Sequence, residues 1–353
     1  MALPTHVLVS PLNWGLGHAS RCVPVIVHCL KLGCKVSIAS DGNALKLLRD
    51  EFPSLQTLEL NSSTVTYSKS GLFFYLKLIL QGFGLQKRAH KDEQLVEDYV
   101  QKHGVDLIIS DHRFGAFSSS VKSVIICHQL QFKAGLFSLT SSYFNAKQLN
   151  RFDEVWVPDT PDQQNLSGIL SRSQQVNVPI KFIGILSRFK NQETQKTIDY
   201  LAIISGPEPL RTQLEDKLIL SFKALRSKSC VLVRGVYEKD SLQDSANLKI
   251  YNHLKSEELN VLINQSKLVI CRSGYSSVMD LACLGKRAFF IPTPHQGEQE
   301  YLAKRLELIN IAPFTSQNNF RMDDVKKSQL YSGFKSEEFT EFPPPQHPEL
   351  LEV

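Results

Sequence analysis

The residues best suited to chemistry lie in one stretch, between Lys267 and Leu302. An apolar run at 268–270 predicts a buried parallel strand, and a helical pattern follows it. The junction between them reads Arg272, Ser273, Gly274. Free N–H groups and the helix dipole at a helix N-terminus attract phosphate oxygens. The spacing therefore favours a diphosphate site, although an ordinary strand–turn–helix unit fits it equally well.

Polar side chains near this junction could bind the rest of a sugar nucleotide. Ser276 and Ser277 add hydroxyls beside the diphosphate, and Asp280, in the second turn of the predicted helix, could bind a ribose diol. Gln299 and Glu300 stand at the tip of the next predicted strand–helix junction. A sugar attached to the diphosphate would lie there.

These residues resemble the donor-binding motif of glycosyltransferase family 28, whose best-known member is the GlcNAc transferase of peptidoglycan synthesis. The matching positions are Cys271-Arg272-Ser273-Gly274, Asp280, Gly285, Pro292-Thr293-Pro294-His295 and Gln299-Glu300. Asp280 stands where the family usually has Glu, and Glu300 replaces the second Gln of a pair, so the resemblance leaves the donor sugar open. It implies the GT-B architecture, two Rossmann-like α/β domains facing each other across a cleft.

The loop after the first predicted strand, His6 to Val9, carries a candidate base. It holds Asn13 and Trp14, expected on the acceptor side, then Gly15 and Gly17, expected to contact the donor, and His18. A G-x-G without a third glycine is a weak dinucleotide signal. The loop instead resembles that of family 28 transferases and of the related UDP-sugar hydrolases of nonulosonic acid synthesis, in which the His lies beside the reacting sugar carbon. A His at a helix start has a lowered pKa that suits a neutral base, but His18 could also be only a helix cap.

Two further predicted strands end in polar residues. Asp111 follows the run at 105–110, and His128 and Gln129 follow the run at 124–127. Strand ends of this kind face the crevice where α/β sheets bind ligands. These residues are second candidates for the base or for acceptor contacts, with a role as loop caps equally open.

The resemblance implies more donor contacts in the second half of the chain. Two prolines in the turn after the strand at 199–205 depart from the family's glycine-rich loop and remove N–H donors, so Arg211 could supply the lost positive charge. The expected donor contacts here are Gly206, Arg211, Arg234, Lys255, Ser256 and His295.

Length and composition predict a soluble protein of two domains. The 353 residues are 42% hydrophobic and 21% charged, with a net charge of +5 that does not indicate a nucleic-acid partner. Seven cysteines without a C-x-x-C pair predict reduced thiols in the cytoplasm. The start of the chain does not resemble a signal peptide. The predicted division is an acceptor-side domain at 1–180 whose last strand lies at 154–157, a linker at 181–198, a nucleotide-sugar domain at 199–330 and a loose tail at 331–353.

An apolar stretch from Leu72 to Leu85 is bordered by basic residues as far as Arg88. Such a stretch could contact an anionic membrane at its inner face, or it could be a core helix with solvated lysines.

The sequence thus predicts a metal-independent inverting glycosyltransferase. A UDP-sugar would be a co-substrate rather than a cofactor, and the unknown acceptor could be lipid-linked. No metal is expected because no D-x-D motif stands at a predicted strand end, and a helix start with nearby arginines can neutralise a diphosphate. The alternatives are a UDP-sugar hydrolase and a non-catalytic subunit that binds nucleotide sugars.

Overall fold

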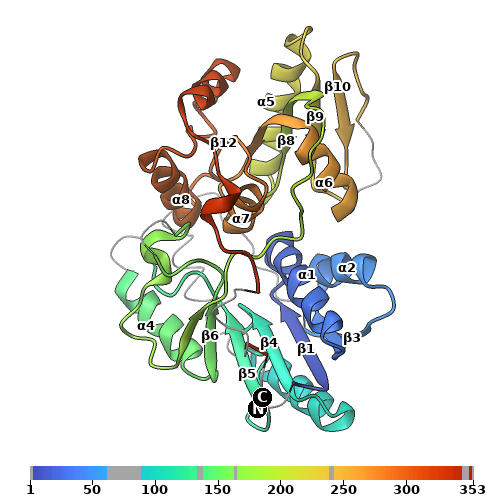
Figure 1. Cartoon of the computed structure of the whole chain (residues 1–353), viewed down its shortest axis with the longest axis vertical. Coiled ribbons are helices and arrows are strands. Elements are labelled where there is room, and N and C mark those ends of the chain that lie inside the picture. The colour runs from blue at the N-terminus through green and yellow to red at the C-terminus, as the bar shows by residue number, and fades with distance from the viewer. Residues whose placement is uncertain are drawn as a thin grey trace. The chain divides into compact units, whose positions relative to one another are not determined.

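The computed structural model describes residues 3–61, 89–132, 138–162, 165–237, 242–343 and 350–351. The chain divides into two compact units (Figure 1). Unit 1 comprises Met1–Ser187 with Thr340–Val353, and unit 2 comprises Arg188–Phe339. The predicted boundaries differ, because the first unit extends past residue 180 and the predicted linker at 181–198 is shared between the units.

Unit 1 is built on a parallel seven-stranded sheet in the order β3-β2-β1-β4-β5-β6-β7. The central strands β1 and β4 are buried at every position and mostly apolar, as expected for a parallel sheet covered on both faces. Because β7 pairs with β6, the prediction that the strand at 154–157 is the last of this domain is wrong. The strands are β1 His6–Pro11, β2 Lys35–Ser40, β3 Gln56–Glu59, β4 Leu107–Asp111, β5 Lys122–Ile126, β6 Glu154–Val157 and β7 Ile180–Phe182.

The helices of unit 1 connect these strands. α1 packs on β1, β2 and α2, and Gly33 ends the turn after it with a positive φ of 83°. The helical segments are α1 Leu16–Lys31, α2 Gly42–Glu51, a helix at 89–103, α4 Ser138–Leu149 and the 3-10 turn η2 Gly168–Ser171.

Unit 2, like unit 1, is built on a parallel sheet, here of five strands in the order β10-β9-β8-β11-β12. The strands are β8 Ile198–Ile203, β9 Cys230–Val233, β10 Leu248–Tyr251, β11 Ser266–Cys271 and β12 Ala288–Phe290. The helices are α5 Leu210–Ala224, α6 Ser256–Gln265, α7 Tyr275–Cys283 and α8 Gly297–Leu308, followed by the 3-10 segments η3 Met322–Leu330 and η4 Ser336–Glu338.

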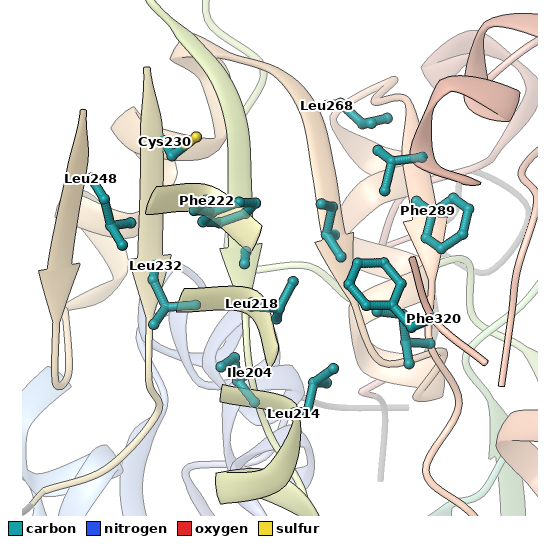
Figure 2. Close-up of a cluster of buried hydrophobic side chains, with 14 residues drawn as sticks. Ile204, Leu214, Leu218, Phe222, Cys230, Leu232, Leu248, Leu268, Phe289 and Phe320 are labelled. Carbon is teal, nitrogen blue, oxygen red and sulfur yellow. The ribbon is translucent and has the colours of Figure 1, made fainter. Parts of the chain in front are cut away.

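The core of unit 2 shows how α5 is held. Its buried residues Leu214, Leu218 and Phe222 are spaced four apart, so they lie on one face of the helix. Figure 2 shows this face directed at Ile204 and Leu232 of the sheet. The packing fixes where α5 begins, and with it the loop at 205–209.

Both sheets have a topological switch point, where the strand order reverses. In unit 1 it lies between β1 and β4, and in unit 2 between β8 and β11. The loops that leave two such strands diverge and open a crevice at their carboxyl ends, which is where α/β sheets bind ligands. The loop that starts with Asn13 and the end of β4 meet at the first switch point. The loop at Gly206 and the junction at Ser273 meet at the second.

The tail differs from the predicted loose segment. Phe334 and Phe339 are buried in unit 2, and the chain then returns to unit 1. There the backbone N–H of Ile185 donates to the carbonyl of Thr340 at 2.8 Å, within a parallel bridge between residues 185 and 341.

The stretch from Leu72 to Arg88 lies outside the described residues. Among the helices that are described, none combines the length and the apolar character that a membrane span requires.

Candidate functional site

Asp111 organises the switch point of unit 1. Its carboxylate is fully buried, and Arg21 binds both carboxylate oxygens through Nε and Nη2. His18 Nδ1 lies 2.8 Å from Asp111 Oδ1. α1 places His18 and Arg21 three residues apart on one face, and β4 ends at Asp111, so these two elements bring the three side chains together.

His18 Nδ1 lies between a hydrogen-bond acceptor, Asp111 Oδ1 at 2.8 Å, and a hydrogen-bond donor, Arg21 Nη2 at 2.9 Å. Each of the two tautomers of His18 therefore satisfies one of these partners. A proton on Nδ1 donates to Asp111, whereas a lone pair on Nδ1 would face a carboxylate oxygen at 2.8 Å. The tautomer whose Nδ1 proton bonds to Asp111 leaves Nε2 as an acceptor. Burial, together with the nearby Arg21 cation, lowers the pKa of His18, so the ring is neutral near pH 7. A neutral imidazole oriented by a carboxylate can accept a proton from a hydroxyl.

Two more histidines border this cluster. His128 is buried, and its Nδ1 lies 3.3 Å from Arg21 Nη1. The His112 ring lies edge-on to the His18 ring, with 5.8 Å between the centroids. His112 has a positive φ of 56°, and burial lowers its pKa to about 3. His112 was not among the predicted site residues. Its place directly after β4, at a strand end, was the signal in the sequence that could have indicated it.

A second buried network supports the first loop. Arg113 donates to Asp41 and, at 2.8 Å, to Asp92, and its Nη2 also donates to the carbonyl of Asn61. Asn13 Nδ2 donates to Asp41 Oδ2 at 3.2 Å. Asn13, expected to contact the acceptor, is thus tied to the end of β2. Its neighbours Trp14 and Gly15 are exposed, and Gly17 and Gln129 are partly buried.

The switch point of unit 2 holds the predicted diphosphate junction. β11 ends at Cys271, and α7 begins after Gly274 with no acidic residue in its first turn. The Ser273 hydroxyl donates to the carbonyl of Gln299 at 2.8 Å, so it ties the junction to α8. Ser276, Ser277 and Asp280 are partly buried along α7.

Arg272 is almost fully buried beneath this junction, at 1% exposure. It donates to the carbonyls of Ser205, Leu210, Ile291 and Pro292 and to Oε1 of Gln317. These bonds hold the Gly206 loop, β12 and the chain near residue 317 together. The sequence predicted that Arg272 contacts the nucleotide-sugar donor. In the structure its N–H groups bond to these carbonyls and to Gln317.

Arg211 and Arg234 share one buried carboxylate, that of Glu215. Arg211 donates to Glu215 and to Glu208, and Arg234 Nε lies 3.0 Å from Glu215. Arg234 Nη1 also donates to Asn252 Oδ1 at 2.8 Å. The two arginines are thus balanced by two carboxylates, Glu208 and Glu215, so the cluster itself has no net charge. The expected contact of Arg211 with the nucleotide-sugar donor stays a prediction.

The remaining predicted donor residues lie on the loops around this switch point. His295 has a positive φ of 65°, and its backbone N–H donates a 3.2 Å hydrogen bond to Glu300 Oε1. Gln299 Oε1 accepts the N–H of Thr293 at 2.8 Å. Lys255 and Ser256 form the start of α6, with Ser256 buried. Among the described residues no cluster of three His, Cys, Asp or Glu side chains is arranged to hold a metal ion.

Comparison with known protein families identifies the second unit. Residues 214–340 match the glycosyltransferase family 28 C-terminal domain. A UDP-N-acetylglucosamine–N-acetylmuramyl-(pentapeptide) pyrophosphoryl-undecaprenol N-acetylglucosamine transferase of a Sulfurihydrogenibium species is 23% identical over 147 residues, 41% of this chain and 42% of that protein. An uncharacterized glycosyltransferase of Methanopyrus kandleri is 20% identical over 294 residues, 78% of this chain and 82% of that protein. This chain thus spans less than half of the Sulfurihydrogenibium protein.

Solved structures share the architecture of the whole chain. The glycotransferase of kitacinnamycin superposes with a TM-score of 0.65 at 13% identity, covering 96% of this chain and 93% of that one. MurG of Acinetobacter baumannii gives 0.54 at 14% identity, covering 93% and 92%. The predicted fold class, GT-B with two Rossmann-like α/β domains, is confirmed.

Proposed function

We propose that this chain transfers a sugar from a nucleotide donor to an acceptor hydroxyl. The match of its C-terminal unit confirms the resemblance to glycosyltransferase family 28. The observation that carries the proposal is the His18–Asp111–Arg21 cluster at the switch point of unit 1. It presents a neutral, oriented imidazole, and His18 keeps 17% of its side-chain surface accessible. Unit 2 supplies the other half of the chemistry, a helix start suited to a diphosphate.

The proposed step is a single displacement with inversion. His18 Nε2 takes the proton of the acceptor hydroxyl as the acceptor oxygen bonds to the anomeric carbon of the sugar. The bond from that carbon to the diphosphate oxygen breaks, and the nucleoside diphosphate leaves with the electron pair. The dipole of α7 and the buried Arg272 guanidinium beneath its start stabilise the developing phosphate charge without a metal.

The donor is proposed to be a UDP-sugar. Asp280 on α7 would hydrogen-bond the ribose, and backbone groups near Lys255 and Ser256 would hold the base. Gln299 and Glu300, at the start of α8, would contact the sugar. The relatives named for UDP-N-acetylglucosamine support a uridine donor, while Glu300 in place of the family's second Gln leaves the sugar to experiment.

The acceptor is proposed to be a hydroxyl compound that could be lipid-linked. The acceptor-side candidates are Asn13, Trp14, His128 and Gln129. The basic and apolar sequence from Leu72 to Arg88 supports contact with an anionic membrane at its cytoplasmic face. Flotation with anionic vesicles at low salt tests that contact, and Lys87→Glu with Arg88→Glu should abolish it.

Release of nucleoside diphosphate from a panel of nucleotide sugars tests the activity. The transferase proposal expects release only with an acceptor mixture, and loss of release in His18→Ala. Fast release into water without any acceptor would instead indicate the hydrolase. Binding of UDP without release under any condition would indicate a non-catalytic subunit.

A further inference from the structure

Thr293 has a buried hydroxyl that the fold does not use. It follows β12 in the run Pro292-Thr293-Pro294, and it is 2% exposed. Its backbone N–H donates to Gln299 Oε1 at 2.8 Å. Its Oγ1 is buried and has no hydrogen-bond partner within the described part of the chain. Buried polar groups are almost always bonded, so an exception at the end of a strand points to a ligand.

The hydroxyl faces the space over Gly206. A Cβ built on Gly206 would lie 3.5 Å from Thr293 Oγ1 and 3.9 Å from Arg272 Nε. Gly206 is exposed and has a φ of 115°, which favours glycine. The space that the missing side chain leaves is therefore bordered by an unbonded hydroxyl and a guanidinium.

Arg272 gives this space a positive potential. Its hydrogen-bond partners in the described part of the chain are neutral, four backbone carbonyls and one side-chain amide. Burial lowers the pKa of Arg272 to about 10, so the side chain remains protonated at neutral pH. A buried cation bonded only to neutral dipoles attracts an anion.

The start of α7 adds to the same potential. α7 is nine residues long, and Gly274 at its N-cap makes no side-chain capping bond. Gln299 connects this helix start to Thr293, because its Oε1 accepts the Thr293 N–H and its Nε2 would lie 3.7 Å from a Cβ on Gly274. The hydroxyl, the guanidinium and the helix dipole thus converge on one small region.

We propose that the Thr293 hydroxyl donates a hydrogen bond to a phosphate oxygen of the bound nucleoside diphosphate, over the α-carbon of Gly206. This inference rests on the proposed function, because it takes the anion to be the diphosphate of the sugar donor. Arg272 acts through its field and by holding the Gly206 loop, while Thr293 makes the contact. Thr293 thereby adds to the donor site a residue that contributes no charge.

Thr293→Val and Thr293→Ser form a matched pair for the test. Valine has nearly the same shape without the hydroxyl, and serine keeps the hydroxyl. Calorimetric titration with UDP and with inorganic pyrophosphate should show binding to Thr293→Val weakened roughly tenfold to a hundredfold, as expected for one hydrogen bond to a charged group. Uridine should bind all forms alike, and Thr293→Ser should bind UDP within about threefold of wild type.

The ligand-free melting temperature supplies an independent readout. Because the hydroxyl has no hydrogen-bond partner to lose among the described residues, Thr293→Val should melt at the same temperature as wild type or higher. A lower melting temperature in Thr293→Val, restored in Thr293→Ser, would show that the hydroxyl is bonded within the protein and would overturn the inference.

The binding results also separate this inference from the transferase proposal. If wild type binds UDP and Thr293→Val binds it equally well, the inference fails and the proposed function is untouched. If wild type binds pyrophosphate but no nucleoside diphosphate, and Thr293→Val loses that binding, the anion contact is supported while the transferase proposal fails. If wild type binds neither, both fail.

Discussion

Asp111 and His18 are both candidate bases from the sequence, but their surroundings suit different roles. Burial alone would raise the pKa of Asp111, yet Arg21 and His18 hold that pKa far below its ordinary range. A carboxylate so strongly stabilised is a weak base. His18 keeps some exposure and has a neutral ring, so we propose that His18 takes the proton and Asp111 orients it.

His18→Ala should lower kcat by about 10²–10⁴-fold, the usual contribution of a general base, and leave UDP affinity nearly unchanged. His28→Ala is a control on the same helix and should keep full activity. Steady-state kinetics and calorimetry measure the two effects. If His18→Ala turns over normally while a folded Asp111→Asn is inactive, Asp111 is the base.

Asp111→Asn should also lower the free energy of unfolding by about 3–5 kcal/mol, because Arg21 would be left buried without its carboxylate. Chemical denaturation checks this value. The neighbouring Cys22→Ala, which removes only a 3.8 Å thiol contact to Asp111, serves as the control for disturbing the cluster.

His112 should make the stability of the protein depend on pH. Burial lowers its folded-state pKa to about 3, against about 6.5 in the unfolded chain, so the unfolded state binds more protons between these values. Stability is fully present above pH 6.5 and falls as the pH drops toward 3, with about 2 kcal/mol lost by pH 5.

His112→Asn should remove this part of the acid sensitivity, because asparagine tolerates the positive φ and does not titrate. Urea midpoints at pH 7 and pH 5 measure it. His295→Asn, at an exposed residue with a similar φ of 65°, is the backbone control. Equal pH dependence in wild type and His112→Asn would show that His112 is not buried in its neutral form.

Among the elements, α6 holds the first residues of unit 2 in place by hydrogen bonds. Asn260 and Asn264, one turn apart, bind the extended chain before β8. The N–H of Lys190 donates to Asn260 Oδ1 and that of Gln192 to Asn264 Oδ1, both at 3.1 Å. Asn264 Nδ2 donates to the carbonyl of Lys190 at 3.0 Å. Part of the predicted polar linker is therefore fixed to unit 2.

Asn264→Ala should lower the free energy of unfolding of unit 2 by about 2 kcal/mol, because it removes the hydrogen bonds between the buried Asn264 side chain and the backbone of Lys190 and Gln192. Denaturant midpoints measure the loss. Val261→Ala, at a 40% exposed site of the same helix, should change stability by less than about 0.5 kcal/mol. Equal midpoints for the two variants would mean that water replaces the asparagine.

At the scale of the whole molecule, unit 1 includes the C-terminal residues of the chain, from Thr340 on. Thr340 and Phe342 bond to Ile185, and a Cβ on Gly184 would lie 2.6 Å from the carbonyl oxygen of Thr340. Leu350 and Leu351 are buried. Deleting the residues after Phe339 therefore removes part of unit 1 and none of unit 2.

That truncation should lower the unfolding midpoint of unit 1 alone. Both tryptophans, Trp14 and Trp156, belong to unit 1, so tryptophan fluorescence reports its unfolding selectively. UDP affinity, assigned to unit 2, should be retained in calorimetry. Thr340→Ala keeps the backbone acceptor and is the control. An unchanged fluorescence midpoint after truncation would show that the tail does not stabilise unit 1.

The sequence alone determined the local features of the chain, which depend only on residues close together in the sequence. Apolar runs placed the strands, 3.6-residue periodicity placed helices such as α1 and α7, and the small residues at Ser273 marked a candidate phosphate-binding turn. Hydrophobic periodicity is local, so it survives without knowledge of the fold. The length of the chain predicted two domains, and the resemblance to family 28 implied their α/β architecture. The short strand β7 has only three residues, too few to show a period. Only its pairing with β6 identifies it as a strand of the first sheet.

Only the tertiary structure decided which side chains share a site. Arg21 and Asp111 are 90 residues apart, and Arg113 and Asp41 are 72 apart. Gly206 and Thr293 meet because β8, β11 and β12 lie in that order in one sheet. Parallel strands bring their carboxyl ends to one edge whatever their separation in the chain. The role of each polar residue then follows from its burial and its partners, which no local pattern contains.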